Sequence, residues 1–262
     1  GEYRHVTKNT KNIIDLSIKN DNAFLTKKNS SETHLFGNSS IKSNFDYFDN
    51  SKILINLEKV SSDSYLKSSD IKSPIINSRD TLKSFVKFEG YTENTDFNLS
   101  AEIFEDLNQS KNSDKYEFIL PNFNLSKNLE TSLSGTLSMN NTGYSKHYKT
   151  NINEKILVND FIYKSMDSIN RLGFVNNYEI FFKNFNSDSK NSNILKRKKQ
   201  HDLEGIIQFN SKLPLKKIGN NYDSTLTPIF SAKFNPYPNK NIMNDVRIID
   251  YNNIFSIDRL SS

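Results

Sequence analysis

The stretch from Leu82 to Glu105, LKSFVKFEGYTENTDFNLSAEIFE, contains two runs in which apolar and polar residues alternate. Successive side chains of a strand point to opposite sides of a sheet, so each run has one apolar and one polar face. Thr92-Glu93-Asn94 separates the runs and predicts the turn of an antiparallel hairpin. We expect one face to carry Phe97, Leu99, Ala101 and Ile103, and the opposite face to carry Lys83, Lys87, Glu89, Asn98, Ser100 and Glu102.

The same alternation recurs along the chain and is plainest from Ser132 to Met139, where Leu133, Leu137 and Met139 share a face with Gly135. We expect roughly a dozen antiparallel strands and negligible helix, because no apolar repeat has helical spacing. Strands are expected at 129–139 and 144–152, with a turn at Asn140-Asn141-Thr142-Gly143. Pro121 marks an edge-like or bulged position, and Ser61 to Asp80 reads as a loop or an interrupted strand.

The composition limits how such strands bury their apolar faces. Hydrophobic residues make up 35% of the chain and its mean hydropathy is −0.67. A disordered chain is one interpretation, but 19 Phe and 12 Tyr oppose it, since disordered segments are poor in aromatics. A transmembrane β-barrel, with an apolar exterior and a polar lumen, fits better. A soluble β-sandwich or a β-solenoid remains open, although no repeat of fixed period is present.

Several function classes lack support in the sequence. Lys and Arg are mixed with Asp and Glu, which argues against a nucleic-acid-binding stripe. There is no cysteine, and no apolar run approaches the length of a transmembrane helix. Catalytic motifs are absent, and the histidines (His5, His34, His147 and His201) lack metal-ligand spacing. We expect no enzyme activity, no cofactor and no metal, and we expect the histidines to be lumen or loop residues.

The two ends of the sequence complete the expected domain organisation. Gly1-Glu2-Tyr3-Arg4 is not a signal peptide, and Asp258 to Ser262 is not a closing aromatic strand. We expect residues 1–262 to be a fragment of one barrel domain, without its closing strands. Residues 236–262 are expected to form a long loop, because their alternation is poor.

Two stretches of sequence resemble the lipopolysaccharide-assembly (LptD) family of Gram-negative outer membranes. The first runs from Asn56 to Lys127 and contains Ser62-Asp63-Ser64-Tyr65-Leu66, the hairpin, and Ile119-Leu120-Pro121. The second runs from Thr225 to Arg259, although Val246 and Ile254 stand where the family has Ser and Leu. The motif residues are Asp63, Tyr65, Leu66, Pro121, Pro228, Asn244, Asp245, Asn253, Phe255, Asp258 and Arg259. Two shorter stretches, Glu2-Tyr3-Arg4-His5 and His34-Leu35-Phe36-Gly37, also resemble strand motifs of this family.

This resemblance implies an integral outer-membrane protein that inserts lipopolysaccharide into the outer leaflet. It also implies three partners: lipopolysaccharide itself, a plug lipoprotein (LptE-like), and periplasmic bridge proteins. Relatives carry cysteines that tie the barrel to a periplasmic domain, and this chain has none. The alternatives are a passive porin and a surface adhesin with a β-rich domain.

Overall fold

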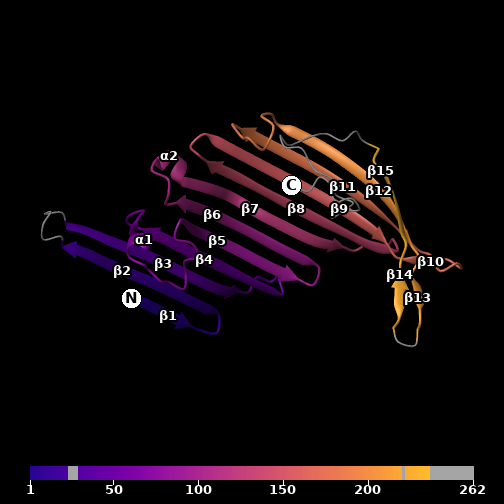
Figure 1. The fold of residues 1–262 in the computed structure, drawn as a ribbon, viewed down its shortest axis with the longest axis horizontal. Helices are drawn as coiled ribbons and strands as arrows, with labels where there is room; N and C mark the ends of the chain where they lie inside the picture. The colour runs from indigo at the N-terminus through magenta and orange to yellow at the C-terminus, as the bar shows by residue number, and fades with distance from the viewer. Residues whose placement is uncertain (23–28, 220–221, 237–262) are drawn as a thin grey trace. The chain divides into compact units, whose positions relative to one another are not determined.

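The computed structural model describes residues 1–22, 29–219 and 222–236 of the chain (Figure 1). It is 67% strand and 4% helix, so the predicted all-β class is confirmed. The strands are β1 (Glu2–Val6), β2 (Thr10–Asn22), β3 (Asn29–Ser43), β4 (Asn50–Val60), β5 (Thr81–Thr92), β6 (Thr95–Asp106), β7 (Tyr116–Leu129), β8 (Gly135–Tyr148), β9 (Ile152–Ser165), β10 (Ser168–Ile169), β11 (Val175–Lys190), β12 (Gln200–Lys212), β13 (Leu215–Lys217), β14 (Ser224–Leu226) and β15 (Ile229–Phe234). The helices are α1 (Tyr65–Ser68) and α2 (Asn112–Lys115). Neither helix in the described ranges is long and apolar enough to cross a membrane.

Hydrogen bonds order the strands of one large sheet as β1-β2-β3-β4-β5-β6-β7-β8-β9-β11-β12-β15, with β10 paired to β11. β13 and β14 form a separate two-stranded sheet. Neighbouring strands are antiparallel from β1 to β6 and again from β11 to β15. Over the residues that the structure describes, β1 and β15 do not pair, so the sheet is open rather than closed into a barrel.

The chain divides into two compact units. The first comprises residues 1–125, 142–156 and 189–192, and the second comprises residues 126–141, 157–188 and 193–262. The predicted hairpin lies in the first unit as β5 and β6. Its two strands are joined by Glu93 and Asn94, and Thr92 pairs with Thr95. The predicted strands and turn are therefore confirmed here.

The predicted strand boundaries and the predicted turn between residues 129 and 152 are wrong, although residues 135–139 and 144–148 are strand as expected. Leu129 ends β7, residues 130–134 form the connection, and β8 runs without interruption through the expected turn at Asn140 to Gly143. The actual turn follows Tyr148, where Lys149 and Thr150 adopt positive φ angles of 46° and 59°. Neither residue type favours that conformation, so the sequence carried no turn signal.

Two further features of this region differ from expectation. Pro121 lies inside β7, which has β6 and β8 as neighbours, so β7 is not an edge strand. The Leu120–Pro121 peptide bond is cis. Gly143 lies in β8 under the ring of Phe123, whose Cε1 is 2.6 Å from where an added Cβ would stand. Glycine here makes room for an aromatic ring and does not form a turn.

The segment between β4 and β5 builds a small hydrophobic core in the first unit. Its members are Phe36, Val60, Tyr65, Leu66, Ile75, Leu82 and Leu107, with Ile13, Ile71 and Ile76 packed against them. Tyr65 and Leu66 belong to α1, and both are fully buried. The predicted loop 61–80 is thus folded back on the strands and held by apolar contacts. Figure 1 shows α1 and α2 at the same end of the strands.

Candidate functional site

The strand register of β4, β5 and β6 places unlike residues on the two faces of the sheet. Directly opposite residues share a face, and Ile55, Val86 and Ala101 follow one another across the three strands. We call this side the outer face. The opposite side, which we call the inner face, carries Leu54, Lys87 and Ser100 in the adjacent row. The predicted division of the hairpin therefore matches the register.

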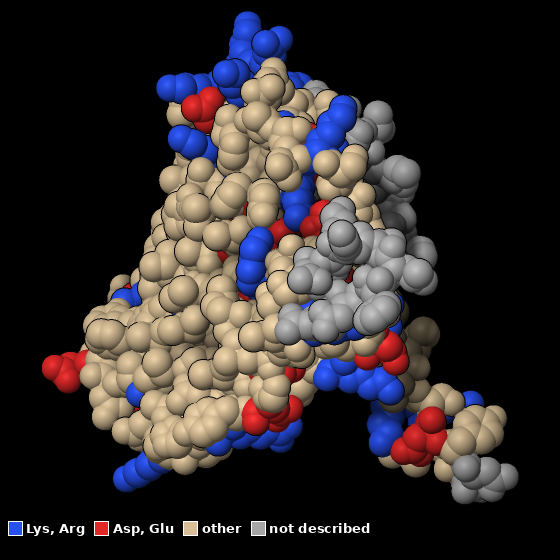
Figure 2. Space-filling model, turned by 90° about the vertical axis from the view of Figure 1, so that its left-hand side faces the viewer, with Lys and Arg blue, Asp and Glu red and all other residues tan. Residues whose placement is uncertain are grey.

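Large apolar side chains on the outer face are exposed. Val86 is 52% exposed, Leu99 40% and Ile103 37%, and Ala101 between the last two is exposed as well. Phe97 is half-buried. A contiguous exposed apolar area of this kind marks an interaction surface. In the view of Figure 2, Lys, Arg, Asp and Glu lie among larger areas of uncharged residues, which include polar as well as apolar side chains.

On the inner face, charged side chains occur in close pairs. Lys83 Nζ lies 2.8 Å from Glu102 Oε2, and Lys52 and Lys87 bind the two oxygens of Glu89 at 2.7 and 2.6 Å. Polar neighbours complete the network. Ser100 Oγ donates to Glu102 Oε1 at 2.7 Å, and Asn98 Nδ2 donates to Asp96 Oδ1 at 2.6 Å. All six residues predicted for the polar face thus lie on one side, and their partners are neighbouring side chains.

Glu58 replaces main-chain pairing where β4 and β5 separate. Their ladder stops at Asn56 and Phe85. Beyond it, the Lys83 N–H donates to Glu58 Oε2 at 2.8 Å, and Asn56 Nδ2 donates to the Lys83 carbonyl at 2.7 Å. The Glu58 N–H donates to Ser84 Oγ at 3.0 Å. Because Glu58 is only 4% exposed, these bonds satisfy groups that water does not reach.

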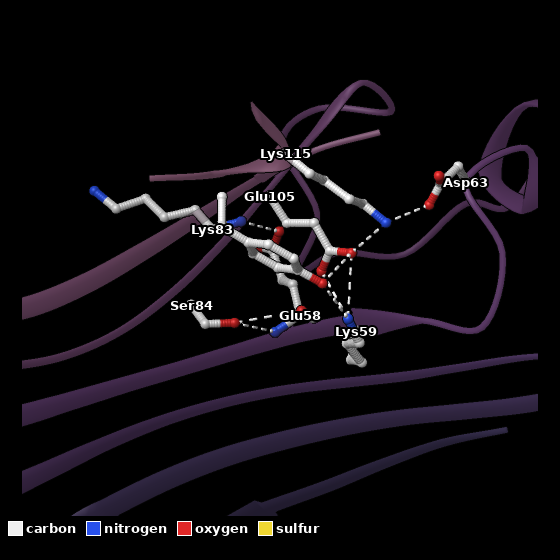
Figure 3. Close-up of polar contacts among 8 residues, drawn as sticks. Glu58, Lys59, Asp63, Lys83, Ser84, Glu105 and Lys115 are labelled. Atoms are coloured by element: carbon white, nitrogen blue, oxygen red, sulfur yellow. Dashed lines mark hydrogen bonds and ion pairs between the residues drawn. The ribbon is translucent and has the colours of Figure 1, made fainter. Parts of the chain in front are cut away.

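A second group, which we call the charged cluster, lies at the helical end of these strands (Figure 3). It comprises Lys59, Asp63, Glu105, Lys115 and Tyr116. Glu105 is buried and lies between two ammonium groups: Lys59 Nζ is 2.9 Å from Oε2, and Lys115 Nζ is 2.8 Å from Oε1. Lys115 also binds Asp63 at 2.6 Å, and Tyr116 Oη donates to Glu105 at 3.2 Å. Two positive and two negative charges cancel in this cluster.

Lys115 joins three segments through that cluster. It ends α2, Asp63 precedes α1, and Glu105 is near the end of β6. Burial alone would lower the pKa of the Lys115 ammonium, but its hydrogen bonds to Asp63 and Glu105 raise the pKa above its ordinary value. The motif residue Asp63 therefore fixes the loop after β4 to the loop before β7.

The motif residues Tyr65 and Leu66 have a structural role. Tyr65 and Leu66 fill the small core, and Tyr65 Oη lies 3.1 Å from Nδ1 of His34. His34 is itself buried, with Nε2 3.4 Å from Asp15 Oδ1. The expectation that His34 is an ordinary lumen or loop residue missed this contact, because Asp15, His34 and Tyr65 are far apart in the sequence.

In the second unit, the residues predicted to share one apolar strand face do not all lie on the same strand. Leu133 lies in the connection between β7 and β8 and is 62% exposed, so its expected place on a strand face is wrong. Leu137 and Met139 share one face of β8 and are half-buried. An exposed apolar face of this unit was not predicted: Tyr178, Ile180 and Phe182 of β11 lie opposite Phe209, Ile207 and Gly205 of β12. The alternation of apolar and polar residues along β11 and β12 could have revealed this face from the sequence.

The motif residues nearer the C-terminus are only partly described. Pro228 lies between β14 and β15, and its carbonyl accepts a hydrogen bond from the Leu213 N–H at 3.0 Å. The others lie outside the described residues, as does nearly all of the expected loop 236–262. These are Asn244, Asp245, Asn253, Phe255, Asp258 and Arg259.

No protein-family model matches the chain, and no curated protein sequence matches it significantly. Within the described ranges, no group of three or more His, Asp or Glu side chains is placed to hold a metal ion. The arrangement offers two contrasting faces and a neutral network of charges.

Proposed function

We propose that this chain forms part of the wall of an outer-membrane β-barrel that inserts lipopolysaccharide into the outer leaflet. The observation that carries the membrane location is the exposed apolar outer face of β4–β6, with paired charges on the inner face. Removing apolar surface from water stabilises a protein by about 25 cal/mol per Å². Lipid chains would provide that gain without a second protein layer.

A membrane location also constrains the edges of the sheet. An unpaired backbone N–H or C=O in hydrocarbon costs several kcal/mol, so spanning sheets are closed. The edges of β1 and β15 would therefore have to pair with further strands. This need to pair every edge strand is the reason for proposing a closed barrel.

Lipopolysaccharide as the cargo is supported by the sequence resemblance. Asp63, Tyr65 and Leu66 have defined structural partners, which is compatible with a motif retained for architecture. On this proposal the inner face contacts the sugar part of the lipid and a plug lipoprotein, and periplasmic bridge proteins deliver the lipid. No catalytic step is assigned to the chain.

A passive porin is the second candidate, because the Lys–Glu pairs of the inner face suit the wall of a water-filled channel equally well. A soluble adhesin is a weaker candidate. Its outer face would need a covering layer, and Val86, Leu99 and Ile103 on that face are exposed.

Photocrosslinking from adjacent residues on opposite faces tests the proposal. p-Benzoylphenylalanine replaces Phe104, a half-buried ring on the inner face, and separately replaces Ile103 on the outer face. We expect lipopolysaccharide or a lipoprotein to be captured from position 104, and only bulk membrane lipid from position 103. Membrane lipid at 103 with neither partner at 104 would favour the porin. No lipid at 103 would overturn the membrane location.

A further inference from the structure

Five aromatic side chains gather where the β3–β4 connection meets the β5–β6 hairpin. We call Phe45, Tyr47, Phe48, Phe88 and Phe97 the aromatic cluster. The ring centroids of Phe48 lie 5.6 Å from Phe88 and 6.3 Å from Phe97, and Phe45 meets Phe88 edge-on at 5.3 Å. Tyr47 meets Phe48 edge-on at 5.0 Å.

The aromatic cluster lies at one end of the outer face. Phe88 and Leu99 are directly opposite each other, and Gly90 is opposite Phe97, so both Phe88 and Phe97 are outer-face residues. The ring of Phe48 lies over Gly90, with carbons 2.8 Å from where an added Cβ would stand. Phe45 and Tyr47 are 50% and 64% exposed. Rings that served only to close a core would be covered.

The opposite end of the same face is charged. Lys59 follows Ile55 and Leu57 on β4, and Glu105 follows Ala101 and Ile103 on β6, at every second residue. Apolar side chains therefore give way to the charged cluster at the same end of both strands. Tyr116 lies beside both ammonium groups, with its ring centroid 5.7 Å from Lys59 Nζ and 5.8 Å from Lys115 Nζ.

The distance between the two clusters fits a bilayer. Glu105 follows Phe97 by eight residues, which is about 27 Å along an antiparallel strand. A strand tilt of about 40° reduces this to roughly 20 Å along the membrane normal, close to the apolar band of about 25 Å in outer-membrane barrels. Aromatic residues flank such bands on both sides.

We infer that the aromatic cluster and the charged cluster mark the two membrane–water boundaries of this part of the wall. Lipid head groups meet the protein at these two levels, and Val86 and Ala101 lie near the middle of the hydrocarbon. This inference rests on the proposed membrane location. It adds which residues meet head groups and which meet acyl chains.

Tryptophan fluorescence in vesicles tests the assignment. The 262 residues contain no tryptophan. The fluorescence of an introduced tryptophan is therefore obtained by subtracting the signal of the unsubstituted protein. Phe97→Trp and Tyr116→Trp report on the two boundaries, and Val86→Trp reports on the middle. Phe85→Trp is the matched control, because Phe85 is the neighbour of Val86 on the inner face. The intact protein is reconstituted with phospholipids brominated either near the head group or near the chain ends.

We expect Val86→Trp to lose more fluorescence with bromine near the chain ends, and both boundary variants to lose more with bromine near the head group. Phe85→Trp should respond weakly to both lipids. Equal depth for Val86 and either boundary position would overturn the boundary assignment while leaving the membrane location intact. If no variant responds to either lipid, the membrane location fails as well.

Discussion

The carboxylate of Glu58 accepts a hydrogen bond from the main-chain N–H of Lys83 at 2.8 Å, just beyond the last paired residues of β4 and β5. Replacing it with leucine would leave a buried donor without its partner, at a cost of about 1–3 kcal/mol. Glu58→Gln keeps an acceptor oxygen and should cost less. Denaturant unfolding of the purified protein measures both variants. Equal losses would mean that the acceptor oxygen does not account for the contribution of Glu58.

An arginine side chain should be tolerated on the inner face and not on the outer face. Val86→Arg puts a guanidinium on the outer face and should destabilise the protein in vesicles by about 2–4 kcal/mol if that face meets hydrocarbon. Lys87→Arg, one residue away on the inner face, keeps the charge and should change little. Comparison of unfolding free energies in lipid vesicles checks this difference. Equal stability of the two variants would contradict the face assignment.

Gly143→Ala should destabilise the first unit, because the added Cβ would stand 2.6 Å from Phe123 Cε1. Overpacking of this kind costs about 1–3 kcal/mol. Combining it with Phe123→Leu should recover part of the loss, so the two changes would not be additive. Gly37→Ala is the control, since its nearest neighbouring atom is 3.9 Å away. Similar losses for both alanine variants would contradict the role given to Phe123.

Leu66→Ala should lower the stability of the folded segment 61–80 by about 2–5 kcal/mol, because Leu66 is fully buried in the small core. Limited trypsin digestion detects the change as faster cleavage after the exposed Lys72. Leu133→Ala, at an exposed leucine, should leave the cleavage rate unchanged. An unchanged rate in Leu66→Ala would show that other contacts hold the segment.

The contact between Lys67 and Asp80 should respond to acid. The hydrogen bond from Lys67 holds the pKa of Asp80 below its ordinary value of 3.8, with Asn108 adding to the effect. A lowered pKa in the folded state means that the contact stabilises the segment above pH 3.8 and that this contribution is lost as the pH falls through the folded-state pKa. Hydrogen exchange of residues 67–80, corrected for intrinsic rates, should therefore become faster at the acid end. In Asp80→Asn this extra acceleration should disappear.

The β5–β6 hairpin was predictable because every level of its sequence agrees. Its alternation has period two, its turn residues are polar, and its charges lie on one face. The charged pairs on that face were not predictable as pairs. Lys52 and Glu89, for example, are brought together by the register of two strands and not by sequence spacing.

The prediction failed at β8 because local signals opposed the tertiary structure. Asn140 to Gly143 has turn-forming residues, yet Phe123 occupies the space that glycine leaves. Lys149 and Thr150 have no turn preference, yet they adopt left-handed conformations. The small core was also hidden, since Tyr65 and Leu66 lie in a serine-rich stretch and find their neighbours on other strands.

The charge pairing on the inner face has an electrical consequence. Each of the lysines at 52, 83 and 87 lies within 2.8 Å of a carboxylate oxygen of Glu89 or Glu102. Fields of such close opposite charges cancel within a few ångströms, and salt screens what remains. A solute moving along these strands would meet donors and acceptors without a net potential. In the proposed barrel, this stretch of wall would therefore present hydrogen-bonding groups rather than a strong field of one sign.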